Sequence, residues 1–486
     1  MFESSVHVLN SKDMDLIHES AQAILSDVGA RVDHPRMREL LADFGCEVDE
    51  KVVKFPETVI EDVVSKMRNP HNLIDGYVGT LPLRRDRFPK EARIIPVATG
   101  QATLAHDLNT DEIRPATRQD LAESCRVVAA LPGSVIGHPV FLPQDAPEMI
   151  RDLLAMKTVA ENFPYSDFVE VYSPEVVPYF LEMGRVICGS EEALKEAPPF
   201  CSWAFATSPL QFGRHGFDIL FKFLDYGLRK GFGVGGVMPI LGASTPLTMA
   251  GYLTMQTAEV LACNIMNWVL LGRVSGYGAG PTILDMKLAT PSQSAPEAVL
   301  LSLACMDLQR YYGETSPMFP YALSADSKFP DIQAGIDKTF SAMVAVLAGC
   351  RVLSAGMGVL SLSGVASLAQ LVIDYELCQY LEHLVKGFVV DEPHIGLEMI
   401  KRVGIGGNFL GEEHTLKYMR ETLFFPKVFD RQMVSSWIEN RKGMLERAKA
   451  RVHEILHSRV PQEYLAPEQV IELDKIIQHA NERLAG

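Results

Sequence analysis

The stretch Asp326-Ser327-Lys328-Phe329-Pro330-Asp331-Ile332-Gln333-Ala334-Gly335-Ile336-Asp337-Lys338 joins an aromatic, strand-like run to a long and almost uncharged segment. Its ionisable side chains are out of place in a core, so it predicts a loop after a buried strand and then a helix starting near Asp331. Loops of this kind often carry functional side chains. The stretch is therefore one strand–loop–helix unit, with Asp326, Lys328, Asp331 and Gln333 as candidate functional residues.

The same unit recurs along the chain. Short apolar or β-branched runs predict strands at residues 134–140, 168–172, 200–204, 232–237, 274–278, 318–323, 351–354 and 387–390. Segments with helical periodicity lie between them, at residues 149–161, 175–188, 217–230, 247–265, 296–312 and 331–348. Eight strand–helix steps predict an α/β fold of the TIM-barrel type, a (β/α)8 barrel. An open, doubly wound sheet is the alternative.

Two additions are predicted around the barrel core, which is assigned to residues 116–400. Residues 1–115 form an N-terminal extension, helical from about residue 11 to residue 67 and rich in β-structure and turns from residue 71 onward. Residues 401–486 form a C-terminal region, in which a glycine- and aromatic-rich loop over 402–431 precedes charged amphipathic helices packed on the barrel.

Composition and charge exclude several classes of partner. The 486 residues are 47% hydrophobic, which suffices for a large core, and the formal net charge is −16. Nucleic acids and anionic membranes select basic surfaces, so neither is an expected partner. The eight cysteines are scattered, residues 1–15 show no signal-peptide pattern, and the longest apolar stretches contain polar residues. We therefore expect a cytoplasmic protein with reduced cysteines and no membrane span.

The sequence lacks the familiar motifs of catalysis and cofactor binding. The glycine-rich runs at 231–236 and 404–407 have neither a Walker lysine nor a dinucleotide-binding context, so they predict tight strand ends. There is no H-E-x-x-H motif, and His453 and His457 fit a solvated helix face. No G-x-S-x-G motif occurs, and Cys263 and Cys350 lie in apolar runs that disfavour a thiolate. No catalytic residue and no metal ligand is assigned.

Aromatic and methionine side chains gather at the predicted strand ends. Such residues are either core or the walls of a site, and their recurrence at strand ends favours a site for a quaternary ammonium ion. A carboxylate on the same ligand would need a cationic or hydrogen-bonding partner, for which Arg273, Lys328 and His414 are candidates. The candidate substrate-binding residues are Trp203, Phe205, Arg273, Tyr277, Asp285, Met286, Phe319, Tyr321, Asp326, Lys328, Asp331, Gln333 and His414.

Four stretches together resemble the trimethylamine methyltransferase family. They are Ala23-Ile24-Leu25-Ser26-Asp27-Val28-Gly29-Ala30-Arg31-Val32, the segment from Asp326 to Gly335, Gln370-Leu371-Val372-Ile373-Asp374, and Gly406-Gly407-Asn408-Phe409-Leu410 followed by His414-Thr415. The resemblance runs from about Asp15 to the C-terminal helix. It implies a (β/α)8 barrel that transfers a methyl group from a methylated amine to the cobalt of a separate corrinoid protein.

The resemblance also implies a substrate class. The founding members use pyrrolysine and act on trimethylamine, whereas this chain has no such residue and resembles the branch that demethylates quaternary amines such as glycine betaine. A quaternary ammonium leaves as a neutral amine, so attack by Co(I) on its methyl carbon needs no general base. The expected partners are the corrinoid protein, the small-molecule quaternary amine and further copies of the chain. No cofactor is expected to stay bound, because the corrinoid (cobalamin) arrives on its own protein.

Two other functions stay open at this level. A barrel enzyme of the lyase or isomerase type could use Asp326, Lys328 and Asp331 as acid–base groups. A non-catalytic betaine-binding protein would need a similar aromatic pocket. The resemblance favours methyl transfer over both.

Overall fold

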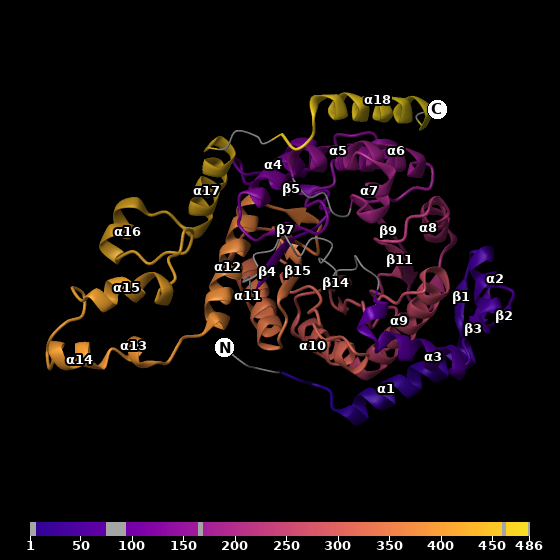
Figure 1. The fold of residues 1–486 in the computed structure, drawn as a ribbon, viewed down its shortest axis with the longest axis horizontal. Coiled ribbons are helices and arrows are strands. Elements are labelled where there is room, and N and C mark those ends of the chain that lie inside the picture. Colours follow the sequence, from indigo (N-terminus) through magenta and orange to yellow (C-terminus); the bar gives the residue numbers. More distant parts are fainter. Residues whose placement is uncertain (1–5, 74–93, 164–168, 459–462, 485–486) are drawn as a thin grey trace.

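Helices encircle short strands in the computed structural model, which describes residues 6–73, 94–163, 169–458 and 463–484. In Figure 1 the surrounding helices follow one another around the strands in chain order. They are α4 (Arg118–Ala129), α5 (Arg151–Asn162), α6 (Val177–Cys188), α8 (Arg214–Tyr226), α9 (Met249–Leu271), α10 (Pro296–Tyr311), α11 (Ile332–Leu347) and α12 (Leu368–Lys386). Six of them, α5, α6 and α8 to α11, confirm predicted helices, because helical spacing of apolar residues is a direct sequence signal.

Parallel strands lie inside these helices. They are β4 (Ile95–Ala98), β7 (Val135–Ile136), β8 (Val169–Glu170), β9 (Phe200–Thr207), β11 (Phe232–Gly235), β12 (Ile240–Leu241), β13 (Thr282–Asp285) and β15 (Val352–Met357). β4 pairs with β7 and β15, β9 pairs with β8 and β11, and β12 pairs with β13. These pairs belong to separate sheets. The mixed α/β class is therefore confirmed, whereas the described residues form no closed barrel.

Three predicted strands are wrong. Residues 274–278 form only an isolated bridge, between Val274 and Leu73. Residues 318–323 turn instead of extending, because Tyr321 adopts the left-handed conformation (φ 56°) and the N–H of Ser324 bonds back to its carbonyl. Residues 387–390 lie outside the ring with their apolar side chains in solvent.

The N-terminal region contains the predicted helices and a small sheet. Its elements are α1 (Ser11–Ala23), a π-helical turn (Ile24–Val28), β1 (Ala30–Val32), α2 (Pro35–Asp43), β2 (Glu47–Asp49), β3 (Val52–Lys54), α3 (Glu57–Met67) and a 3-10 turn (Pro70–Asn72). A capping box between Asn10 and Asp13 starts α1. β1 pairs with β3 and, in parallel, with β10 (Gln211–Phe212), which joins β9. Of the predicted β-rich segment, residues 74–93 lie outside the described residues.

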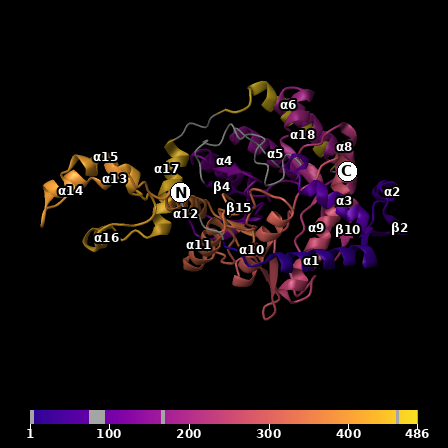
Figure 2. The same ribbon diagram turned by 60° about the horizontal axis from the view of Figure 1, so that its bottom comes forward.

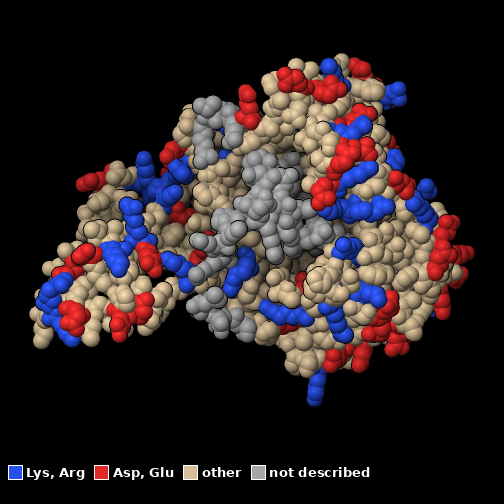
Figure 3. Space-filling model, in the orientation of Figure 1, with Lys and Arg blue, Asp and Glu red and all other residues tan. Residues whose placement is uncertain are grey.

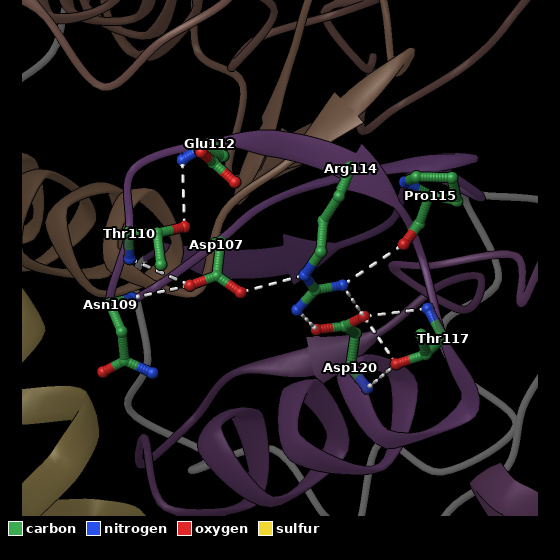
Figure 4. A network of polar contacts seen from close by, with 8 residues as sticks. All are labelled: Asp107, Asn109, Thr110, Glu112, Arg114, Pro115, Thr117 and Asp120. Atoms are coloured by element: carbon green, nitrogen blue, oxygen red, sulfur yellow. Dashed lines mark hydrogen bonds and ion pairs between the residues drawn. The ribbon is translucent and has the colours of Figure 1, made fainter.

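A polar network holds the hairpin of β5 (Leu104–His106) and β6 (Ile113–Pro115) against α4 (Figure 4). The guanidinium of Arg114 donates to both carboxylate oxygens of Asp120, at 2.7 and 2.9 Å, and to Asp107 at 2.9 Å. Asp120 in turn closes a capping box with Thr117 at the start of α4. The remaining elements are a 3-10 turn (Glu148–Ile150), α7 (Glu191–Glu196), β14 (Thr290–Ser292), β16 (Val359–Leu360) and β17 (Val365–Ala366).

The C-terminal region has two parts. Its helices are α13 (Glu392–Ile395), α14 (Leu397–Val403), α15 (Glu413–Thr422), α16 (Val434–Asn440), α17 (Met444–Ser458) and α18 (Pro467–Leu484). α17 packs on α12 and α4, and α18 packs on α5 and α6. α13 to α16 project away from the ring in both Figures 1 and 2. The prediction of a loop over 402–431 is therefore wrong at α15, a helix whose residues are all at least partly exposed.

Acidic and basic side chains are interspersed over the described part of the face in Figure 3. All eight cysteines are free, and all except Cys188 are buried. None of the helices among the described residues has the length and apolar character needed to cross a membrane.

Candidate functional site

Strand β9 presents two aromatic side chains to the interior of the ring. Phe200 and Ala204 face outward: the Phe200 ring packs on Phe180 of α6, and Ala204 lies against Gly216 of α8. Because side chains alternate along a strand, Trp203 and Phe205 point inward.

Glycines of the neighbouring strand make room for these two rings. A Cβ on Gly233 would lie 2.6 Å from the Trp203 ring, and a Cβ on Gly236 would overlap the Phe205 ring. Gly236 also has a φ of +65°, which L side chains rarely adopt. The glycine-rich run 231–236 is therefore explained by close packing against aromatic side chains, in line with the predicted tight strand end.

A buried carboxylate shares this interior face. Glu170 pairs in register with Cys201, so its side chain lies on the same side of the sheet as Trp203 and Phe205. The Glu170 side chain is largely enclosed, with 8% of the residue exposed, and its Oε2 accepts the Tyr172 hydroxyl at 3.1 Å. Among the described residues no cation pairs with Glu170. Buried carboxylates are normally paired, so this one is suited to a positively charged ligand.

Tyr172 is held from several sides. Its N–H donates to Asp152 Oδ2 at 3.3 Å, its carbonyl lies 2.7 Å from His215 Nε2, and its hydroxyl also contacts the side-chain oxygen of Gln101. Burial, with a contribution from the Glu170 charge, raises the pKa of Asp152 to about 6. Gln101 follows β4 and has a φ of 55°, a strained conformation that is typical of functional sites. Tyr172 therefore connects the ends of two strands, β8 and β4, that do not pair.

The ends of three adjacent strands leave apolar side chains partly exposed. Tyr172 after β8, Phe205 in β9 and Met238 after β11 are 44%, 39% and 49% exposed. Together with Glu170 they combine aromatic and apolar surface with a negative charge, which is the arrangement that binds quaternary ammonium groups.

The segment that follows Tyr321 is a network of its own. The Ser292 hydroxyl donates to Asp326 Oδ2, whereas Asp326 Oδ1 is buried without a partner among the described residues. The Nζ of Lys328 donates to the Asp326 carbonyl at 2.8 Å, and Asp331 caps α11 by accepting the Ala334 N–H at 2.9 Å. Lys328 and Asp331 thus stabilise the turn, and the free Oδ1 of Asp326 is the polar atom here that a ligand could engage.

Comparison with known proteins connects this arrangement to a family. The model of the family described as trimethylamine methyltransferase (MTTB) matches residues 3–484 of the chain. The chain belongs to the trimethylamine methyltransferase family. It is therefore an enzyme of the methyltransferase class.

Individual relatives of this family are similar over most of their length. The trimethylamine methyltransferase MttB of Desulfitobacterium hafniense (strain DSM 10664 / DCB-2) is 28% identical over 459 residues, which cover 93% of this chain and 90% of the relative. The trimethylamine methyltransferase MttB of Methanosarcina barkeri (strain Fusaro / DSM 804) is 28% identical, with 93% and 90% covered. The glycine betaine methyltransferase of D. hafniense (strain Y51) is 25% identical, with 94% and 93% covered.

Two of the aromatic residues that were predicted to line the site pack instead in the core of this chain. Tyr277 and Phe319 are each 1% exposed. The Tyr277 hydroxyl lies 2.9 Å from the Thr257 hydroxyl and its ring stacks on Tyr312, with 5.6 Å between centroids. The N–H of Phe319 donates to Cys350 Sγ. The sequence could not separate core rings from site rings because depth leaves no sequence signal.

The other candidates are spread over the molecule. Tyr321 places its hydroxyl against Gly280. Asp285 accepts the N–H groups of Lys287 and Leu288 in the turn between β13 and β14, and Met286 is exposed in the same turn. Arg273 lies two residues after the end of α9 and donates to the His71 carbonyl. Gln333 is exposed on α11. His414 lies on α15 and contacts the carbonyl of Pro393 on α13.

A buried ion pair escaped the sequence prediction, although Lys338 ends the stretch from Asp326 that predicted the strand–loop–helix unit and Asp374 lies in a stretch that carries the family resemblance. Lys338 Nζ donates to Asp374 Oδ2 at 2.9 Å and to the carbonyls of Leu323 and Gly356 at 2.8 and 2.7 Å. Both side chains are completely enclosed. Burial lowers the pKa of Lys338 and raises that of Asp374, while each charge opposes the shift of the other. The pair joins the turn before Asp326 to the end of β15.

The described residues give little support for metal-dependent catalysis or for a thiol nucleophile. No group of three or more His, Cys, Asp and Glu side chains in that part of the chain could hold a metal ion. Burial raises the pKa of the Cys263 and Cys350 thiols, which opposes nucleophilic thiolate chemistry. A pocket of about 410 Å³ lies instead between the β5–β6 hairpin, α4 and α17, where His453 and His457 contribute to its wall.

Proposed function

We propose that the chain transfers a methyl group from a quaternary amine, such as glycine betaine or a related betaine, to Co(I) of a partner corrinoid protein. The observation that carries the proposal is the combination of inward aromatic side chains with the buried carboxylate of Glu170 at the strand ends, which no cation among the described residues pairs with. The glycine betaine methyltransferase of D. hafniense supports the substrate class, and so does the absence of pyrrolysine.

We also infer that the fold is a (β/α)8 barrel. Parallel pairing brings β15 back to β4, and eight helices surround the strands in chain order. Strand β4 lies within residues 1–115, so the proposed barrel takes in the end of that region as well as residues 116–400. Residues 401–486 remain the proposed C-terminal part. The site residues would then lie at the carboxyl ends of the strands, where such barrels carry their chemistry.

The chain's own residues would act by binding and positioning. The faces of Trp203, Phe205 and Tyr172 would hold the methylated nitrogen, and Glu170 would balance its charge. The corrinoid supplies the Co(I) nucleophile that accepts the methyl group. The partly exposed apolar side chains of Tyr172, Phe205 and Met238 fit a cofactor that approaches from outside on another protein. Because the leaving group is a neutral amine, no side chain has to donate or accept a proton.

Family membership favours this activity over lyase or isomerase chemistry and over non-catalytic binding. The acid–base alternative would rely on Asp326, Lys328 and Asp331, of which the last two make hydrogen bonds within the turn. We propose a cytoplasmic homo-oligomer that binds neither nucleic acid nor membrane, in keeping with the acidic composition.

The variant Glu170→Gln tests the site. Glutamine keeps an oxygen for the Tyr172 hydroxyl but removes the charge. Two unit charges about 5 Å apart interact by roughly 3 kcal/mol at an effective dielectric constant of 20. We therefore expect the KM for glycine betaine to rise about 100-fold.

The exposed residue Glu192 on α7 provides the control variant Glu192→Gln, for which KM should not change. Methyl transfer to cob(I)alamin is followed by the change in the cobalt spectrum. An unaltered KM in Glu170→Gln would contradict the assignment of Glu170 to the substrate site.

A further inference from the structure

Residues 388–440, which we call the arm, leave the ring at the end of α12 and return to it at α17. None of the four helices in the arm, α13 to α16, contains a buried residue. Figures 1 and 2 show the arm projecting from the rest of the molecule in both views. A segment of this length without a core of its own needs another surface to cover it.

The base of the arm is firmly attached. The buried carboxylate of Glu376 on α12 accepts the N–H groups of Lys427, Val428 and Phe429 at 2.8 to 2.9 Å. The ring of Tyr380 packs on Phe429, with 5.6 Å between centroids. The arm is therefore held in a defined position relative to α12.

Polar and aromatic contacts also fix the inside of the arm. His394 and His414 both pack on Tyr418, with ring centroids 4.5 and 4.6 Å away, and Arg402 pairs with Glu412. These contacts connect α13, α14 and α15. The apolar side chains that remain outside them thus form a preformed surface.

That surface is unusually apolar for a solvated segment. Sixteen of the 39 exposed large apolar side chains in the described residues lie between Phe388 and Ile438, and Phe388, Ile405 and Leu410 are among the most exposed. Their exposed fractions correspond to on the order of 2,000 Å² of apolar surface, at roughly 180 Å² for each fully exposed side chain. A standard stable interface buries roughly 800 Å² on each partner, so less than half of this summed apolar surface would suffice for one.

The same chain carries a second uncovered apolar surface. Ile332, Ile336 and Phe340 recur every four residues on one side of α11 and are 83%, 63% and 46% exposed. The arm and this α11 stripe do not cover each other within one chain, since both remain exposed. Two apolar surfaces on one chain can belong to a single two-fold interface, in which the arm of each copy covers the stripe of the other.

The arm carries charges of both signs. Residues 388–440 contain eight acidic and six basic side chains. This mixture gives the arm no large field of one sign that would oppose a second copy. In a βα unit the helix runs back from the carboxyl end of its strand, so it ends on the opposite side of the barrel. The arm starts at the C-terminal end of α12 and therefore lies away from the carboxyl ends of the strands. An arm interface would thus leave the proposed substrate site open.

We propose that the arm is the interface between two copies of this chain, in which each arm packs on the α11 stripe of its partner. The paired variant Ile405→Glu/Leu410→Glu places charges on the arm, and Ile332→Glu/Ile336→Glu places them on the stripe. All four side chains are exposed in the single chain, so folding should survive, as judged by an unchanged circular dichroism spectrum. Ile471→Glu on α18, also exposed, is the matched control.

The full-length protein is measured by sedimentation equilibrium at micromolar concentration. We expect twice the 53.7 kDa chain mass for the wild type and for the control, and the single-chain mass for both paired variants. A monomeric wild type, or a dimer that persists in either paired variant, would overturn the proposal. The readout is mass alone, so it is independent of the substrate assignment.

Discussion

The variant Lys338→Met removes the cation of the buried pair between α11 and α12. Methionine fills a similar volume, but it leaves Asp374 without its counter-ion and the carbonyls of Leu323 and Gly356 without their shared donor. Asp374 keeps hydrogen bonds from the Gly358 N–H and the Gln370 side chain. Removing one partner of a buried ion pair costs about 3 to 5 kcal/mol. Each unpaired carbonyl adds roughly 1 kcal/mol.

We therefore expect the free energy of unfolding to fall by about 5 to 7 kcal/mol, a large part of the 5 to 15 kcal/mol that is typical of a folded domain. Urea denaturation followed by far-UV circular dichroism measures the loss. Lys328→Met is the control, because Lys328 is exposed and bonds a single carbonyl, and its effect should stay below about 0.5 kcal/mol.

The double variant Lys338→Met/Asp374→Leu separates the ion pair from general damage. It removes both charges, so it should recover at least about 2 kcal/mol relative to the sum of the two single variants. A loss below about 1 kcal/mol in Lys338→Met, or additive effects in the double variant, would refute the reasoning.

Two further predictions concern the candidate site. The pKa of Asp152 is raised to about 6 from 3.8, so the folded protein holds this proton more tightly than the unfolded chain does. The contribution of Asp152 to the free energy of unfolding therefore becomes less favourable by up to about 3 kcal/mol as pH rises from 4 to 7. Asp152→Asn should then be more stable than the wild type at pH 7.5 and equally stable near pH 4 in urea titrations; a difference independent of pH would contradict this. Gly236→Ala should displace the Phe205 ring and weaken binding of glycine betaine at least about 10-fold in calorimetry, since it adds a clash to an unfavourable φ. Gly189→Ala has the same φ problem without a clash and should bind normally; equal affinity in both variants would remove Phe205 from the site.

The helices were predictable because their signal is local. The predicted helix at 296–312 corresponds to α10, Pro296–Tyr311, and the helix predicted to start near Asp331 corresponds to α11, which Asp331 caps. Three strands were predicted wrongly, because the conformation of these runs depends on information that a single sequence does not carry. The run 318–323 has strand-like composition, yet the left-handed backbone of Tyr321 turns it. The apolar run 387–390 resembles a buried strand but is exposed, which is expected of a surface that another chain covers.

The site was predictable in part. Alternation along β9 puts Trp203 and Phe205 on one face, whereas the depth of Tyr277 and Phe319 depends on how the elements pack. Glu170 was missed, although a single carboxylate in the apolar run Val169-Glu170-Val171-Tyr172 is a signal that could have found it. Lys338 was overlooked because its partner, Asp374, lies 36 residues later.

Methyl transfer to free cob(I)alamin tests the proposed function most directly. The purified chain is incubated with reduced corrinoid and, separately, with trimethylamine, glycine betaine and longer betaines, and the cobalt spectrum is followed. We expect methylcobalamin to form with at least one quaternary amine and to form much more slowly with trimethylamine. Formation with trimethylamine alone, or with no quaternary amine while the corrinoid stays reduced, would contradict the proposed function.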